Sequence, residues 1–115
     1  MHELSIAQAI AEGVSAHAAA HKATRVTVVR LRVGEAAGIL PAALTGCFEM
    51  VASCDPILAG ARLAIDLVPH RARCRRCGGE FGVVNFVAQC PACATWETDV
   101  LSGTELEVRD MEIET

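Results

Sequence analysis

Aromatic residues and long apolar runs are what this 115-residue chain most lacks. It contains no Tyr, one Trp and three Phe, so stacking on nucleic-acid bases or sugar rings has little support. No run approaches the roughly 18 apolar residues that a membrane span needs, and the first residues lack the basic start of a secretory signal. We therefore expect a cytoplasmic protein that binds neither nucleic acid nor a membrane.

The charge balance and the cysteine count further restrict the functional classes to which this protein can belong. The formal net charge of −4 repels a polyphosphate backbone except where basic residues cluster. Hydrophobic residues make up 52% of the chain, which is enough for one compact domain with a small appendage. In a reducing compartment the six cysteines remain available as thiolates. Metal binding is therefore a better expectation than disulfide formation.

The periodic segments predict two helices and three strands. Ser5 and Gln8 have the spacing of a capping box, which predicts a helix from Ser5 to about His21. Pro41 suits the first turn of a second helix, which ends before Asp55. Alternating apolar residues predict strands over residues 25–33, 63–68 and 106–113.

The segment between the second and third strands differs in character. Residues 70–98 carry Arg, Gly and Cys in place of periodic apolar residues, which is typical where a metal replaces a hydrophobic core. The expected fold is α/β, with a small sheet of about three strands, two helices and an inserted zinc-ribbon-like module. Residues 1–69 and 99–115 form the α/β domain in this interpretation, and residues 70–98 form the zinc-binding module.

Two CxxC pairs carry the strongest chemical signal. Cys74 and Cys77 are followed, after twelve residues, by Cys90 and Cys93. Two such knuckles close a tetrahedron of Zn–S bonds of about 2.3 Å, so we expect structural zinc. Iron in a rubredoxin-like electron carrier is an alternative, although that fold surrounds its iron with aromatics that this chain lacks. Four thiolates leave no open position for a water molecule, so we expect no enzyme activity.

The zinc module also contains a basic cluster, formed by Arg71, Arg73, Arg75 and Arg76. It has three interpretations: a nucleic-acid patch, screening of a tetrathiolate centre with charge −2, or docking of an acidic partner. A zinc-ribbon nucleic-acid accessory protein is therefore the second functional hypothesis. The overall acidity and the scarcity of aromatics argue against it.

Other candidate ligands have less specific patterns. His17 and His21 are four residues apart on the first helix and could face one metal, but solvent-facing polarity among alanines is the favoured role. His70 lies beside the zinc module and could tune it or contact partners. Cys47 and Cys54 fall on or just after the second helix, where a small buried hydrophobe is the common role.

The N-terminus offers a second metal site. The Met1 amine, the His2 amide nitrogen and the His2 imidazole close a five-membered and a six-membered chelate ring. The Glu3 amide or carboxylate, or a partner's ligand, could fill a fourth position. Nitrogen-rich tetragonal sites suit Ni(II) or Cu(II). Acidification should release the metal, because its ligands would be protonated.

Taken together, these features resemble the HypA/HybF family of nickel metallochaperones. The resemblance spans the chain: Met1–Ser5, the strand ending in residues 31–35, the helix from Pro41 to Glu49, both knuckles, and residues 103–108 and 111–114. One departure is Ala94, where family members often carry Gly after the last knuckle cysteine.

The resemblance implies delivery of Ni(II) during [NiFe]-hydrogenase maturation. Nickel would bind at His2 with Met1 and Glu3, so residues 1–69 and 99–115 would form the nickel-binding domain. Structural Zn(II) would bind Cys74, Cys77, Cys90 and Cys93. The implied partners are the HypB-type maturation GTPase and the hydrogenase large subunit. We expect a monomer or weak dimer.

Overall fold

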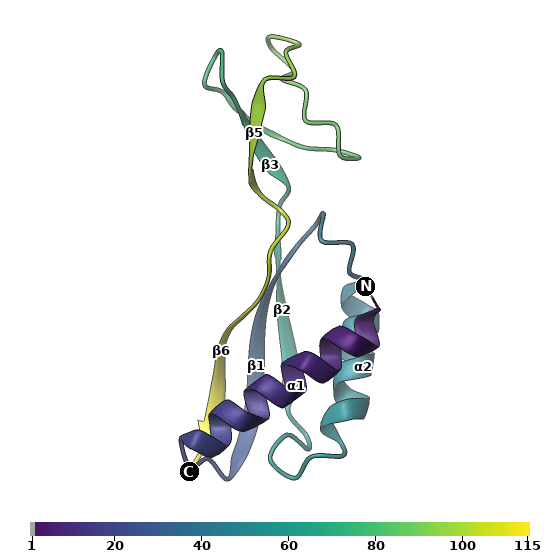
Figure 1. The fold of residues 1–115 in the computed structure, drawn as a ribbon, viewed down its shortest axis with the longest axis vertical. Coiled ribbons are helices and arrows are strands. Elements are labelled where there is room, and N and C mark those ends of the chain that lie inside the picture. The colour runs from purple at the N-terminus through teal and green to yellow at the C-terminus, as the bar shows by residue number, and fades with distance from the viewer. Residues whose placement is uncertain (1) are drawn as a thin grey trace. The chain divides into compact units, whose positions relative to one another are not determined.

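The computed structural model describes residues 2–115, which form two helices and six strands (Figure 1). The elements are α1 (Glu3–Ala20), β1 (Arg25–Gly34), α2 (Pro41–Ala52), β2 (Arg62–Val68), β3 (Arg71–Cys74), β4 (Glu80–Gly82), β5 (Thr98–Ser102) and β6 (Leu106–Glu114). None of the helices in this part of the chain is long and apolar enough to cross a membrane. The predicted α/β fold with an inserted zinc-ribbon-like module is confirmed.

The chain divides into two compact units. The helical unit comprises the residues up to Arg32, Gly38–Asp66 and Glu107–Thr115. The cysteine unit comprises Val33–Ala37 and Leu67–Leu106. The assignment of nickel to residues 1–69 and 99–115, and of zinc to residues 70–98, stays a prediction.

The first sheet has the strand order β2-β1-β6, so the three predicted strands do pair with one another. Helix α2 connects β1 to β2, and the Glu35 amide donates to the Val68 carbonyl where both strands end, as in a parallel crossover. On the other side of β1, the Thr24 amide donates to Glu114 and the Gly34 amide to Glu105, so β6 runs antiparallel. Strand β6 therefore forms one edge of the sheet.

The two helices supply the apolar face that buries this unit's core, and α1 passes in front of the strands in Figure 1. Along α1 the buried side chains recur every three to four residues, at Ile6, Ala7, Ala11, Val14 and Ala18. They share the core with Val26, Val29, Leu31, Leu44, Phe48 and Leu58, each of which is completely buried.

The predicted start of α1 at Ser5 is wrong. The helix begins at Glu3, with His2 in extended conformation at its N-cap and without a side-chain capping hydrogen bond. Water can satisfy the free N–H groups of an exposed first turn, so a capping side chain is not obligatory. Pro41, by contrast, occupies the first turn of α2 as predicted.

The cysteine unit contains a second sheet that the sequence pattern did not reveal. Strand β3 lies between β4 and β5 and is antiparallel to both. Its core is small, formed by Ala72, Cys74, Phe81, Val83 and Cys90. Because two of these five side chains are thiols, apolar burial alone gives this unit little stability.

Two glycines of the cysteine unit permit a close crossing of backbones. A Cβ atom on Gly34 would overlap the Gly103 carbonyl, and one on Gly103 would lie 2.5 Å from the His70 Cα. Gly103 also has φ +110°, a conformation that L residues rarely adopt. Hydrogen bonds of 2.7 Å, from Gly34 N to Glu105 O and from Ala36 N to Gly103 O, hold the segments together.

Candidate metal centre

The four cysteines of the CxxC pairs come together at one end of the second sheet. Their sulfur atoms all lie within 4.8 Å of one another, and the Cys77 and Cys90 sulfurs are 3.8 Å apart. A disulfide requires about 2.05 Å, whereas tetrahedral Zn–S bonds of about 2.3 Å place sulfurs about 3.8 Å apart. The donor set therefore fits a tetrathiolate zinc ion.

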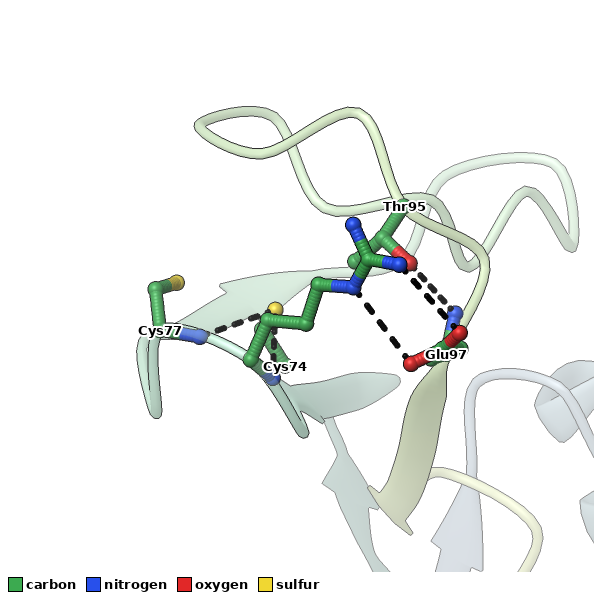
Figure 2. A network of polar contacts seen from close by, with 5 residues as sticks. Cys74, Cys77, Thr95 and Glu97 are labelled. Carbon is green, nitrogen blue, oxygen red and sulfur yellow. Dashed lines mark hydrogen bonds and ion pairs between the residues drawn. The ribbon is translucent and has the colours of Figure 1, made fainter.

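Backbone turns hold each pair of sulfurs in place. In the first knuckle, the Arg76 and Cys77 amides point at the Cys74 sulfur at 3.3 and 3.4 Å, the second contact being visible in Figure 2. In the second knuckle, the Cys93 amide donates to the Cys90 sulfur at 3.4 Å. Such N–H donors stabilise thiolate charge. Cys74 and Cys90 are buried, whereas Cys77 and Cys93 are exposed.

The pKa values of two of the thiols are shifted in opposite directions. Hydrogen bonds from the Cys77 and Arg76 amides lower the pKa of the Cys74 thiol to about 7, although burial opposes this shift. The hydrogen bond with Cys77, together with burial and the neighbouring thiols, raises the pKa of Cys93 to about 12. Zinc must displace the remaining protons, so acid should weaken its binding.

The basic cluster beside the cysteines is largely neutralised within its own unit. Arg73 pairs with Glu80 at 3.5 Å, Arg75 with Asp99 at 2.6 Å, and Arg76 with Glu97 at 3.4 Å. Glu97 is fixed further, because its amide donates to the Thr95 hydroxyl (Figure 2). Three of the four arginines therefore already have carboxylate partners, which disfavours the interpretation as a nucleic-acid patch.

Each knuckle is followed by a residue in the left-handed region. Gly78 has φ +73°, and Ala94 has φ +58° at the equivalent place. Both amides donate to the carbonyl of the first cysteine, from Gly78 to Cys74 and from Ala94 to Cys90. The departure at Ala94 noted in the sequence is thus a point of backbone strain, because an L residue adopts this conformation at a cost of about 1–2 kcal/mol.

We predict that Ala94→Gly stabilises the cysteine unit. Relief of the strain, less the greater chain entropy of glycine, leaves a gain of about 0.5–1 kcal/mol. Urea unfolding of the zinc-loaded protein would measure it, followed through the fluorescence of Trp96, the single tryptophan.

Ala92→Gly is the matched control, because Ala92 lies in the same loop and is not among the residues with positive φ. This change should destabilise the unit slightly. Stabilisation by both substitutions, or by neither, would contradict the role of strain at Ala94.

Two of the residues predicted to bind nickel, His2 and Glu3, lie at the start of α1. His2 is exposed, with φ −80° and ψ 137°, and Glu3 is the first helical residue. Met1 lies outside the described residues. The structure therefore places His2 and Glu3 next to each other without testing them as ligands.

The other candidate ligands separate into one pair and three single residues. The rings of His17 and His21 contact each other, with centroids 4.6 Å apart. The His70 ring lies 5.8 Å from that of Phe86, an exposed residue that sequence reasoning overlooked. Cys47 is half-buried, but Cys54 is exposed, so its expected burial is wrong.

A family model and the sequences of known proteins both match this chain, and they indicate the same family. Residues 1–113 match the family model described as "Hydrogenase/urease nickel incorporation, metallochaperone, hypA". The hydrogenase maturation factor HypA of Geobacter metallireducens is 41% identical over 114 residues, covering 99% of this chain and 100% of that protein. The HypA of Geotalea uraniireducens is 42% identical, with the same coverage.

Solved structures agree on the fold. The solution structure of the Ni metallochaperone HypA from Helicobacter pylori matches with a TM-score of 0.70 and 20% identity, covering 99% of this chain and 98% of that one. A second solution structure of a HypA protein gives a TM-score of 0.73, also at 20% identity, covering 98% and 96%. Since the family model spans nearly the whole sequence, this chain belongs to the HypA family of nickel metallochaperones for hydrogenase maturation.

Proposed function

We propose that this protein captures Ni(II) with its N-terminal residues and delivers it to a [NiFe]-hydrogenase by ligand exchange. The Met1 amine and the His2 amide and imidazole supply three nitrogens, and Glu3 supplies a further ligand. The observation that carries the proposal is the position of His2, exposed and extended directly before α1. Its side chain forms no capping bond with the helix and is available to a metal.

The start of α1 supports chelation by backbone nitrogens. The His2 carbonyl accepts the first helical hydrogen bond, from Ile6, whereas the amides of His2 and Glu3 precede the residues that donate within the helix. Deprotonation of either amide therefore breaks no helical hydrogen bond. Loss of the amide proton also lowers the net charge of the complex, which limits its repulsion by the positive end of the helix dipole.

Nickel titration by calorimetry tests this site. The untagged, zinc-loaded protein should bind one Ni(II) tightly, and His2→Ala should weaken the binding by at least about 100-fold, because two chelate rings depend on this residue. Adding one residue before Met1 should weaken it similarly, since it moves the amine while leaving His2 in place.

His70→Ala is the control, because it removes an imidazole of the cysteine unit and should leave nickel affinity unchanged. If neither the His2 change nor the extension weakened binding, nickel would have to be held elsewhere.

The cysteine unit has a structural role in this proposal. Zinc bound by Cys74, Cys77, Cys90 and Cys93 has every position filled, so it orders the unit without activating a water molecule. The protein then acts by binding and transfer and not as an enzyme. Nickel and zinc thus occupy separate sites with different donor atoms.

The partners follow from delivery during hydrogenase maturation, which already implies work with other proteins of that pathway. We propose the HypB-type GTPase as the source or regulator of nickel transfer and the hydrogenase large subunit as its recipient, both in the cytoplasm. The family description also includes urease, but the relatives cited above are named as hydrogenase maturation factors. A monomer or weak dimer stays our prediction.

A further inference from the structure

Two histidines at the C-terminal end of α1 are used by neither proposed metal site. His17 lies in the last turn of α1, and His21 is the C-cap residue that follows, its amide donating to the His17 carbonyl. Both side chains are exposed to solvent. Their rings meet edge to face, with centroids 4.6 Å apart and an interplanar angle of 75°. The structure therefore holds two imidazole rings, each able to offer a nitrogen ligand, side by side at the C-terminal end of this helix.

The separation of the rings suits chelation of one ion. With metal–nitrogen bonds of about 2.0 Å, two imidazoles at right angles around a metal have centroids about 4.5 Å apart, and tetrahedral ligands about 5.2 Å. The observed 4.6 Å is close to the first value. The interplanar angle imposes no obstacle, because each ring can rotate about its metal–nitrogen bond. The pair thus has the spacing of neighbouring ligands in a tetragonal site.

The surroundings leave room for an ion and its water ligands. Both histidines line an open hollow between α1 and β6, whose other walls include Arg109, Met111 and Ile113. Asp110 also borders it, but its carboxylate accepts a 2.7 Å hydrogen bond from Arg30. Within residues 2–115 the four cysteines are the only group of three or more clustered ligands, so the histidines would act as a pair.

We propose that His17 and His21 form a second metal site, a bis-imidazole chelate for a divalent transition-metal ion that accepts tetragonal nitrogen coordination, such as Ni(II) or Cu(II). Water completes the coordination sphere, and the nearby positive charge of Arg109 keeps the affinity below that of a three-nitrogen chelate. The site is independent of the N-terminal residues.

Nickel titration of zinc-loaded His2→Ala protein tests this site apart from the N-terminal one. One Ni(II) should still bind, and adding His17→Ala or His21→Ala should raise its dissociation constant by at least about tenfold, because a direct ligand is lost. Both side chains are exposed, His17 within α1 and His21 at its C-cap without a side-chain role in the core, so the variants should fold. Far-UV circular dichroism would verify this.

A relocated histidine provides the matched control. In the same His2→Ala background, His21→Ala combined with Ala19→His keeps the number of imidazoles but puts them two residues apart, on different faces of α1. It should bind as weakly as His21→Ala alone, and His70→Ala should change nothing. The proposal is overturned if His2→Ala protein binds no nickel, or if the relocated pair binds as well as His17 with His21. The N-terminal site is tested separately, by comparing the nickel affinity of the His2→Ala protein with that of the unchanged protein.

Discussion

Cys90→Ser is expected to abolish stoichiometric zinc binding and to unfold the cysteine unit while the helical unit stays folded. Cys90 is one of the four clustered sulfurs and is also buried in the unit's core. Zinc binding contributes on the order of 10–16 kcal/mol to the folding of small tetrahedral sites at neutral pH. The small apolar core of this unit offers little to replace that contribution.

The composition of the two cores explains why the effect should be confined to one unit. The cysteine unit buries five side chains in its core, two of which are thiols. In the helical unit, α1 and α2 pack against each other and bury Val14, Leu44 and Phe48. That core contains no predicted metal ligand and can persist without zinc.

Metal analysis and amide NMR spectra would measure the two effects together. Zinc content should fall from one equivalent to none, and dispersed signals should disappear for the cysteine unit, residues 33–37 and 67–106, while those of the helical unit remain. Cys54→Ser is the control, because Cys54 is exposed and lies outside the cluster. A Cys90→Ser protein that kept both its zinc and its spectrum would show that the cluster is not the metal centre.

Gly103→Ala is expected to destabilise the cysteine unit by about 3 kcal/mol, the sum of two costs of different origin. An L residue in a left-handed conformation costs about 1–2 kcal/mol, and forcing extra atoms into packed structure costs about 1–3 kcal/mol. The second cost arises here because the new methyl group would lie 2.5 Å from the His70 Cα. Backbone atoms cannot move aside as the end of a flexible side chain can.

Gly78→Ala isolates the first of these costs within the same unit. Gly78 has φ +73°, but a Cβ there would meet no atom within 4 Å. Urea unfolding should therefore show a loss of only about 1 kcal/mol for this variant. Equal losses for Gly78→Ala and Gly103→Ala would mean that the backbone crossing relaxes without cost.

Local sequence patterns were sufficient wherever the determining interactions lie close together in the chain. The CxxC spacing predicted two knuckles because three residues suffice to turn the backbone amides toward a sulfur. Pro41 predicted the first turn of α2, and alternation predicted the three strands of the first sheet. The start of α1 was misplaced because Ser5 has the form of a cap, whereas the structure uses His2.

The sequence pattern did not predict the second sheet because its strands are only three to five residues long. In β3 only two residues, Ala72 and Cys74, are buried, which is too few to establish a repeat. Arg73 and Arg75 find their carboxylate partners on β4 and β5, and such pairing cannot be read from either segment alone. For the same reason the arginine cluster had three interpretations until the structure supplied its partners.

The sequence by itself determined the ligand types, the order of the two helices and of the strands of the first sheet, and the family resemblance, because each depends on residue identity and spacing. Only the tertiary structure decided that the four sulfurs stand at zinc distance, that Gly34 and Gly103 permit a backbone crossing, and that Ala94 is strained. It also brought the rings of His17 and His21 into contact beside β6. The sulfur distances and the backbone crossing are fixed by packing between segments far apart in the chain, and packing is what a one-dimensional pattern lacks. The Ala94 dihedral and the histidine ring contact are local, but they depend on coordinates that residue identity and spacing do not supply.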